Sequence, residues 1–218
     1  MASATLSINS RNYGAWSLRG WLMCRFAGLD FEVDERSAQD PSQRDELLLM
    51  SPSFLVPCLT VDDLEIWDTL AIGEYLAERF PEAGLLPADV ATRALCRSVS
   101  GEMHSGFASL RSAMPMNVKA RYEEFKVFSG AQADIDRICS VWARCLSLQP
   151  GPFLFGERPT MADAMYAPVC SRFTTYGVEL DSTSRAYVTT VLDLPDVAAW
   201  IAAAEAEPDE IIELDAEF

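Results

Sequence analysis

Residues 51–81, SPSFLVPCLTVDDLEIWDTLAIGEYLAERFP, hold the pattern that decides the fold. Two short runs of strand-forming residues, 58–61 and 64–67, flank the dipeptide Asp62-Asp63. A dipeptide of this kind suits a tight turn, so the two runs predict a pair of antiparallel strands.

Asp68 and Thr69 follow the second of these strands and mark the start of a helix. Either side chain can accept hydrogen bonds from the free N–H groups of a first helical turn. Apolar residues then recur at helical spacing as far as Phe80, and Pro81 ends the helix. The quoted stretch therefore predicts a strand, a hairpin, a second strand and a helix.

The residues before this stretch alternate between strand and helix patterns. Residues 4–9 place Leu6 and Ile8 on one face, as a half-buried strand does. Apolar residues over 18–26 follow helical spacing, and alternation returns over residues 31–33. The first part of the chain predicts the order βαβ followed by ββα.

Beyond a short linker rich in Pro and Gly, the periodicity is helical throughout. Apolar residues predict one long helix over 95–110 and another over 135–145. We expect an α/β domain, residues 1–81, of thioredoxin-like order, and an all-helical domain, residues 88–218.

Residues 153–169, FLFGERPTMADAMYAPV, contain a helix start of a specific kind. Thr160 and Asp163 form a capping box, in which each side chain can satisfy a free backbone N–H of the first turn. A last helix is predicted over 195–204, and the acidic residues 205–218 after it are expected to be loosely held.

Composition excludes several classes of function. The chain has 218 residues, 17 basic and 33 acidic side chains, a net charge of −16 and a pI near 4.3. Half of the residues are hydrophobic and mean hydropathy is +0.06, enough to build a core. Nucleic-acid and membrane partners are not expected, since both attract clustered Lys and Arg. Without a leader pattern or an apolar span, we expect a cytoplasmic protein.

The cysteines and the single histidine argue against a metal or disulfide framework. No CxxC pair or His-Cys spacing suited to a metal occurs, so we expect no metal. We interpret the cysteines as reduced thiols, most of them small buried apolar residues. They are Cys24, Cys58, Cys96, Cys139, Cys145 and Cys170.

The order of a βαβ-ββα domain before a helical domain resembles that of the cytosolic glutathione transferases. Residues 51–81 resemble the family stretch in which Val-Pro precedes a strand, a hairpin and an acid-hydroxyl pair that opens a helix. Residues 153–169 resemble the capping-box helix of the family's second domain, and Gly156 matches as well. The resemblance covers nearly the whole chain.

The resemblance implies a site for glutathione. A cis proline at Pro57 would direct the N–H and C=O of Val56 outward, where an extended peptide can pair with them. Asp68 and Thr69 stand at a helix N-terminus, which favours a carboxylate. We expect Thr69 to hold the γ-glutamyl carboxylate and Asp68 the ammonium group; the alternative is that Asp68 is only a cap and Pro57 only a turn.

The group that stabilises the glutathione thiolate is less evident. Residues 10–22, SRNYGAWSLRGWL, resemble a bacterial subgroup with a Ser-Ser pair before the Trp, but Gly14 and Ala15 stand there. The backbone N–H groups of the turn are also candidates. The side chains left as catalytic donors, of which we favour Tyr13 or Asn12, are those of Ser10, Asn12, Tyr13 and Ser17.

Residues 102–117, EMHSGFASLRSAMPMN, resemble the same subgroup and are expected to line the pocket for the electrophile. His104 and Arg111 are seven positions apart, which places them on one face of the predicted helix. Arg111 is a candidate for binding an acidic substrate; pairing with one of the many acids is the alternative. The apolar candidates for this pocket are Phe107, Met114 and Met116.

The resemblance predicts a glutathione transferase-like enzyme in which the thiolate attacks a small electrophilic or acidic substrate. It also implies a homodimer. Two alternatives stay open: a glutathione-dependent isomerase, and a non-catalytic glutathione or ligand binder that kept the fold without the serine pair.

Overall fold

The structure is a computed structural model that describes residues 4–36, 41, 56–122 and 124–208. Its strands are β1 (Ala4–Ile8), β2 (Glu32–Glu35), β3 (Cys58–Val61) and β4 (Leu64–Trp67). Its helices are α1 (Ala15–Phe26), α3 (Thr69–Arg79), the short η1 (Pro81–Ala83), α4 (Val90–Ser105), α5 (Ala108–Ala113), α6 (Ser129–Leu146), α7 (Met161–Thr175), α8 (Ser182–Leu192) and α9 (Pro195–Ala206).

The four strands form one mixed sheet in the order β2-β1-β3-β4. β1 runs parallel to β2 and antiparallel to β3, and β4 completes an antiparallel hairpin with β3. Asp62, in the turn of that hairpin, has a left-handed φ of 52°. The strand and hairpin predictions for this part of the chain are confirmed.

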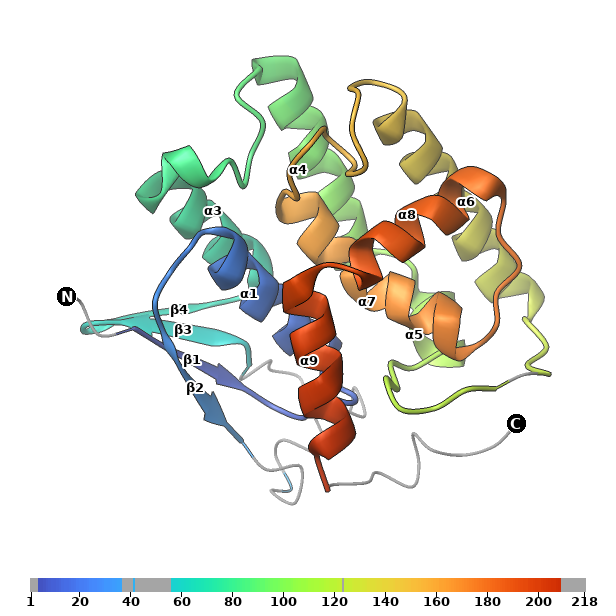
Figure 1. The fold of residues 1–218 in the computed structure, drawn as a ribbon, viewed down its shortest axis with the longest axis horizontal. Helices are drawn as coiled ribbons and strands as arrows, with labels where there is room; N and C mark the ends of the chain where they lie inside the picture. Colours follow the sequence, from blue (N-terminus) through green and yellow to red (C-terminus); the bar gives the residue numbers. More distant parts are fainter. Residues whose placement is uncertain (1–3, 37–40, 42–55, 123, 209–218) are drawn as a thin grey trace.

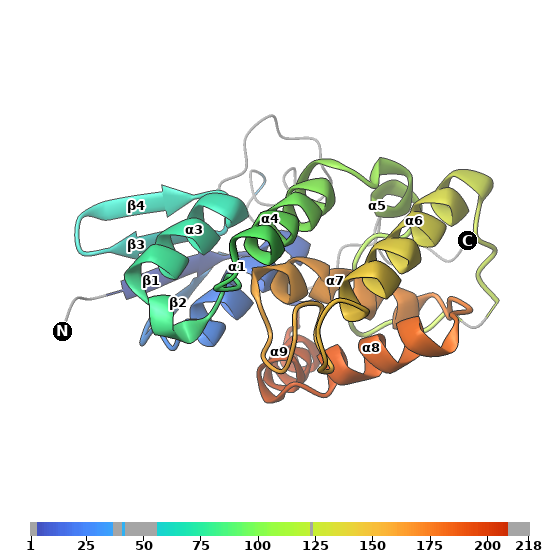
Figure 2. The same ribbon diagram turned by 90° about the horizontal axis from the view of Figure 1, so that it is seen from above.

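The sheet forms one layer of the α/β part, and helices α1 and α3 form the other (Figure 1). These two helices lie together against the sheet, and helices α4 to α9 form a second body beside them (Figure 2). α7 runs through the middle, in contact with α1, α4 and α8, and nearly all its side chains are buried. The fold class of a mixed α/β part followed by an all-helical part is confirmed; the exact boundaries, 1–81 and 88–218, stay predictions.

The prediction of one long helix over 95–110 is wrong. α4 ends at Ser105, Phe107 takes a left-handed φ of 60°, and α5 begins at Ala108. A side chain at Gly106 would lie 2.7 Å from the Glu102 carbonyl oxygen, so only glycine fits this corner. The break separates His104 from Arg111, which therefore do not share one helix face.

The capping box at the start of α7 is confirmed, and it is fully buried. Asp163 accepts hydrogen bonds from the Thr160 N–H at 2.7 Å and the Thr160 hydroxyl at 2.8 Å. It also accepts from the Leu154 N–H at 3.0 Å and the Tyr187 hydroxyl at 2.9 Å. One carboxylate thus joins α7, α8 and the loop before them.

All six cysteines are free thiols. Cys58, half-buried beside Pro57, has its pKa raised, chiefly by burial and then by the charge of Glu65. It therefore carries less thiolate than an exposed cysteine. Among the residues that the structure describes, no helix is both long and apolar enough to cross a membrane.

Candidate active site

A pocket of about 520 Å³ opens between the start of α3, the start of α1 and the end of α4. From α4 it receives His104 and Ser105. From the α/β part it is lined by Trp16, Val56, Pro57, Trp67, Asp68 and Thr69. The structure therefore brings together the four residues expected to bind glutathione, and adds His104 from the expected substrate pocket.

The Val56–Pro57 peptide bond, which is cis, forms one wall of the pocket. Val56 is buried, and the Pro57 ring lies against α1. A side chain at Gly20 would lie 2.8 Å from that ring, so the absence of a side chain lets α1 approach this wall. The residues before Val56 in the stretch that decides the fold, 51–55, lie outside the described part of the chain.

Asp68 caps α3 with one carboxylate oxygen and faces the pocket with the other. Its Oδ1 accepts from the N–H groups of Leu70 at 2.8 Å and Ala71 at 3.3 Å. Its Oδ2 lies 3.2 Å from Nε2 of His104. The backbone of Asp68 has φ 74°, a conformation that non-glycine residues adopt rarely and that clusters at functional sites.

Thr69 is the first residue of α3, and its hydroxyl is buried. Among the described residues, its Oγ1 has no hydrogen-bond partner. A buried hydroxyl without a partner costs free energy, and in a pocket wall at a helix N-terminus a ligand carboxylate would satisfy it. The residues at the start of α3 thus fit both charged groups of an amino acid end: a carboxylate at Thr69 and an ammonium group at Asp68.

Trp16 was not expected at this site, yet it forms the wall between the pocket and the interior. Its ring meets the His104 ring edge-on, with 5.2 Å between centroids. The guanidinium carbons of Arg19 and Arg111 lie 4.4 Å and 4.8 Å from its centroid. A sequence signal existed: Arg19 follows Trp16 by three positions, the spacing at which helical side chains meet.

Arg111 and the apolar candidates lie behind the pocket rather than in its wall. Arg111 donates to the carbonyl oxygens of Met103, Gly106 and His104, which the end of α4 leaves free. Burial lowers its pKa to about 10. The other expected residues, buried in the helical core, are Phe107, Met114 and Met116.

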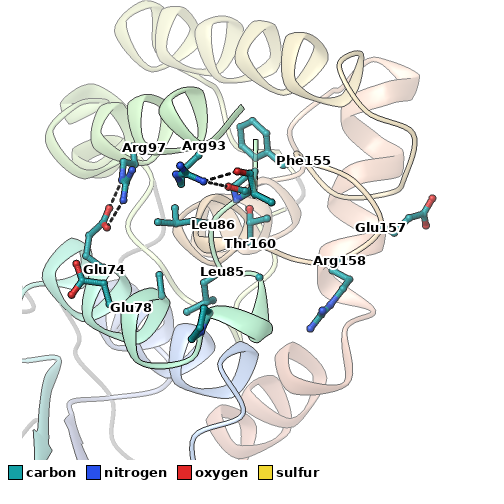
Figure 3. Close-up of a pocket in the computed structure, with 15 residues that line it drawn as sticks. Glu74, Glu78, Leu85, Leu86, Arg93, Arg97, Phe155, Glu157, Arg158 and Thr160 are labelled. Carbon is teal, nitrogen blue, oxygen red and sulfur yellow. Dashed lines mark hydrogen bonds and ion pairs between the residues drawn. The ribbon is translucent and has the colours of Figure 1, made fainter. Parts of the chain in front are cut away.

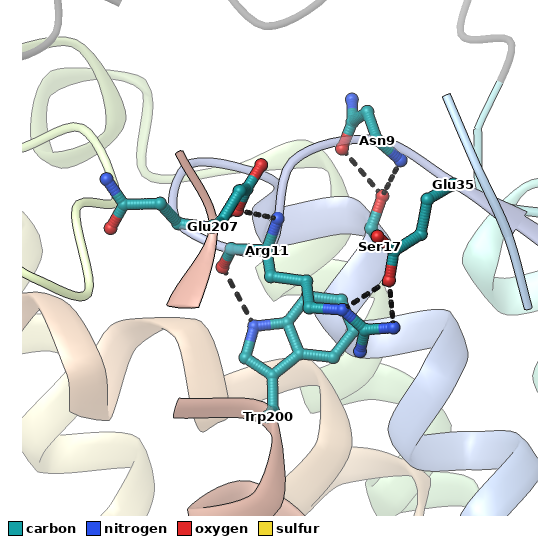
Figure 4. A network of polar contacts seen from close by, with 7 residues as sticks. Asn9, Arg11, Ser17, Glu35, Trp200 and Glu207 are labelled. Atoms are coloured by element: carbon teal, nitrogen blue, oxygen red, sulfur yellow. Dashed lines mark hydrogen bonds and ion pairs between the residues drawn. The ribbon is translucent and has the colours of Figure 1, made fainter. Parts of the chain in front are cut away.

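The four candidate catalytic side chains, Ser10, Asn12, Tyr13 and Ser17, are buried in the turn before α1 or at the start of α1, and none of them lines the pocket. The Ser17 hydroxyl donates to Oδ1 of Asn9 at 2.7 Å and accepts from the Asn9 N–H at 3.1 Å (Figure 4). Oδ1 of Asn12 accepts from the Lys119 N–H at 3.0 Å. Tyr13 is only 5% exposed. Asn12 and Ser17 thus hold the turn in place.

The backbone of this turn is also held, by a residue far along the chain. Oε2 of Glu207 accepts from the N–H groups of Arg11 at 2.8 Å and Asn12 at 2.9 Å. The indole N–H of Trp200 donates to the Arg11 carbonyl at 2.9 Å (Figure 4). Glu207 is therefore fixed, against the expectation of a loose acidic end; residues 209–218 lie outside the described part.

A second hollow of about 670 Å³ lies near the C-terminal end of α3, away from Asp68 (Figure 3). Among its charged side chains, Glu74 pairs with Arg97, and Arg93 donates to the carbonyls of Pro87 and Ala88. Arg93 thus holds the linker between the two parts of the chain, and the Glu74–Arg97 pair joins α3 to α4.

Within residues 4–36, 41, 56–122 and 124–208, no group of three or more His, Cys, Asp or Glu side chains is placed to hold a metal ion. The pocket is lined by the polar side chains of Asp68, Thr69, His104 and Ser105.

Comparisons with known proteins fit this geometry. The family described as glutathione S-transferase, N-terminal domain, matches residues 13–79, and its C-terminal domain matches residues 117–203. Glutathione S-transferase 1 of Dianthus caryophyllus is 30% identical over 171 residues, 76% of each chain. The chain belongs to the glutathione S-transferase family. The prediction of a glutathione transferase-like enzyme is confirmed at the level of the family.

Further relatives are similar to this chain over most of their length. Maleylacetoacetate isomerase of Rattus norvegicus is 28% identical over 173 residues, 78% of each chain. A glutathione transferase homologue from Burkholderia, solved with bound glutathione, superposes with a TM-score of 0.70 at 23% identity, over 95% of this chain and all of that one. Maleylacetoacetate isomerase from Anaeromyxobacter dehalogenans, with bound glutathione, gives 0.68 at 24% identity, over 96% and 99%. These structures confirm the fold.

Proposed function

We propose that the pocket binds glutathione with its γ-glutamyl end at the start of α3. The buried Thr69 hydroxyl without a partner among the described residues carries this proposal, together with Oδ2 of Asp68 beside it. Thr69 and the α3 N-terminus take the carboxylate, and Asp68 takes the ammonium group. The peptide then runs along Val56 as an added strand, which directs the thiol toward α1.

The bound thiol must lose its proton to react. A free thiol has a pKa near 8.5. Each unit by which a protein lowers this pKa needs about 1.4 kcal/mol of preferential stabilisation of the thiolate. Of the four candidate side chains, we propose Tyr13, two positions before α1, as the donor to the thiolate. The thiolate then attacks a small electrophile in the space beside Trp16 and His104.

The test is the ultraviolet absorbance of the thiolate in bound glutathione, followed against pH. We expect an apparent thiol pKa at least one unit below that of free glutathione, and a rise toward the free value in Tyr13→Phe. Asn12→Ala is the matched variant, because the Asn12 side chain already accepts a hydrogen bond from the Lys119 N–H. An unshifted thiol in the wild type contradicts the enzymatic proposal and favours a non-catalytic glutathione binder.

A second candidate is a glutathione-dependent cis-trans isomerase, favoured by the relatives named maleylacetoacetate isomerase. The thiolate would add to a carbon-carbon double bond, the new single bond would rotate, and elimination would return the thiolate. Glutathione is then regenerated, whereas a transferase consumes one glutathione per product. Counting free thiol during turnover of an acidic alkene distinguishes the two reactions.

The assembly and location also belong to this proposal. We propose a homodimer, as implied by the resemblance of the whole chain to the family. A cytoplasmic location fits six free thiols, which a reducing compartment preserves. Sedimentation of the purified protein tests the first, and fractionation of the source cells tests the second.

A further inference from the structure

His104 is the only histidine in the chain, and it contacts the carboxylate that the proposed glutathione site depends on. Its Nε2 lies 3.2 Å from Oδ2 of Asp68, so the pair links the last turn of α4 to the start of α3 across the pocket. Both side chains are partly exposed, 31% for His104 and 41% for Asp68. A ligand that enters the pocket therefore meets both.

We propose that His104 is a positioning residue for glutathione: its neutral imidazole orients Asp68 toward the ligand, and its protonated form competes with the ligand's ammonium group for Asp68. This inference rests on the proposed function, because it assumes that Asp68 takes that ammonium group.

The two carboxylate oxygens of Asp68 have different hydrogen-bond partners. Oδ1 is committed to the N–H groups of Leu70 and Ala71, which α3 needs at its first turn. Oδ2 is left for groups in the pocket, and His104 already reaches it. The ammonium group of a ligand must share this oxygen with the imidazole or displace it.

The protonation state of His104 determines how strongly the imidazole competes with the ligand's ammonium group for Oδ2 of Asp68. With the proton on Nε2, a neutral imidazole donates to Asp68 and leaves its carboxylate charge for the ligand. A second proton on Nδ1 would enter a buried position, where no described residue offers a hydrogen-bond partner. It would also place a cation beside the site of the ligand's cation.

Among the residues that the structure describes, charged groups reach the surroundings of His104 from three elements, α1, α3 and α5. Asp68 faces it from the start of α3, and from α5 Arg111 donates to its carbonyl oxygen. From α1 it meets the Trp16 ring, over which Arg19 is stacked. Histidine side chains exchange their proton between about pH 5 and 8, where carboxylates and guanidinium groups do not. Among the described residues around the pocket, His104 is therefore the group that we expect to give a pH dependence in this window.

The experiment is calorimetric titration of the full chain with S-methylglutathione from pH 8 to 5.5. This probe has no thiol, so the ionisation of the glutathione sulfur does not contribute. We expect affinity to fall about three- to five-fold toward pH 5.5, the effect of a partly exposed ion pair. In His104→Gln, which keeps a donor and cannot be protonated, we expect the affinity to stay constant over the same range.

A second measurement needs no variant. The single imidazole gives one set of side-chain resonances in NMR spectra, and saturating S-methylglutathione should move its titration midpoint to lower pH, as reciprocal linkage requires. A flat wild-type affinity, an equal pH dependence in His104→Gln or an unmoved midpoint overturns the inference. Absence of binding at pH 8 in the wild type instead overturns the proposed glutathione site, and the inference with it.

Discussion

The starts of α7 and α3 both contain an aspartate and a threonine, but the two pairs have different surroundings. At α7, Thr160 and Asp163 are buried, and four donors meet the Asp163 carboxylate. At α3, Asp68 gives one oxygen to the helix and turns the other to the pocket, and the described residues offer the Thr69 hydroxyl no partner. An acid with a threonine at a helix start is therefore structural or functional according to which polar atoms the fold leaves unsatisfied.

The largest expected effect is on the structural member of this comparison. Asp163→Ala would leave two N–H groups and the hydroxyls of Thr160 and Tyr187 buried without this acceptor. We expect the free energy of unfolding to fall by about 3 to 5 kcal/mol. Urea denaturation measures it, and Asp163→Asn, which keeps one acceptor oxygen, should lose less. A loss below 1 kcal/mol in both variants would contradict the structural role.

Asp68→Asn should separate binding from stability at the other helix. Asparagine caps a helix about as well as aspartate, so the free energy of unfolding should change by less than about 1 kcal/mol. Loss of the carboxylate charge should weaken glutathione binding about ten- to a hundred-fold, the worth of a charged hydrogen bond. Calorimetry and urea denaturation on the same preparation test both halves; unchanged affinity would show that Asp68 is only a cap.

Thr69→Val removes only the buried hydroxyl. Because that hydroxyl has no partner within the described residues, its removal should not lower the free energy of unfolding. Affinity for glutathione should fall about five-fold, and Thr69→Ser, which keeps the hydroxyl, should retain most of it. If Thr69→Val destabilises the protein and binds glutathione normally, the hydroxyl serves the fold instead.

The smallest effect is expected at Glu74, a charged residue of α3 outside the pocket. A hydrogen bond from Arg97 is the main cause that lowers the pKa of Glu74, although both side chains are largely solvated. Such a pair contributes under 1 kcal/mol, present above the ordinary glutamate pKa of about 4.3 and lost as pH falls through the lowered value. Glu74→Gln should thus reduce stability slightly at pH 7, with no change in glutathione affinity. A weaker affinity would show that the overall charge of the protein, rather than the residues at the start of α3, determines glutathione binding.

Sequence patterns predicted the elements that depend on local chemistry. The strands around Asp62-Asp63, the cap at Asp68 and the capping box at Thr160 all follow from short-range spacing, and the structure has them. The prediction of one helix over 95–110 was wrong for a physical reason. The apolar periodicity continues through Gly106, whereas the chain turns at Phe107.

The rest of the site depends on contacts that no local pattern contains. Trp16 faces the pocket with Arg111 from another helix stacked over it, and Glu207 reaches the Asn12 N–H across 195 positions of sequence. The family resemblance placed Asn12 and Ser17 near the expected thiol, but the bonds that engage them come from Lys119 and Asn9. The resemblance predicted the residues that we propose to bind glutathione, whereas tertiary packing engages Asn12 and Ser17 in bonds that the sequence pattern does not contain.

The most direct test of the central claim is a double-mutant cycle between protein and ligand. Wild type and Asp68→Asn are titrated with S-methylglutathione and with its analogue lacking the γ-glutamyl amino group. If Asp68 holds the ammonium group, the wild type prefers S-methylglutathione by about ten-fold or more, and Asp68→Asn loses that preference. An equal preference in both proteins would show that the start of α3 does not bind the γ-glutamyl end, and would contradict the account.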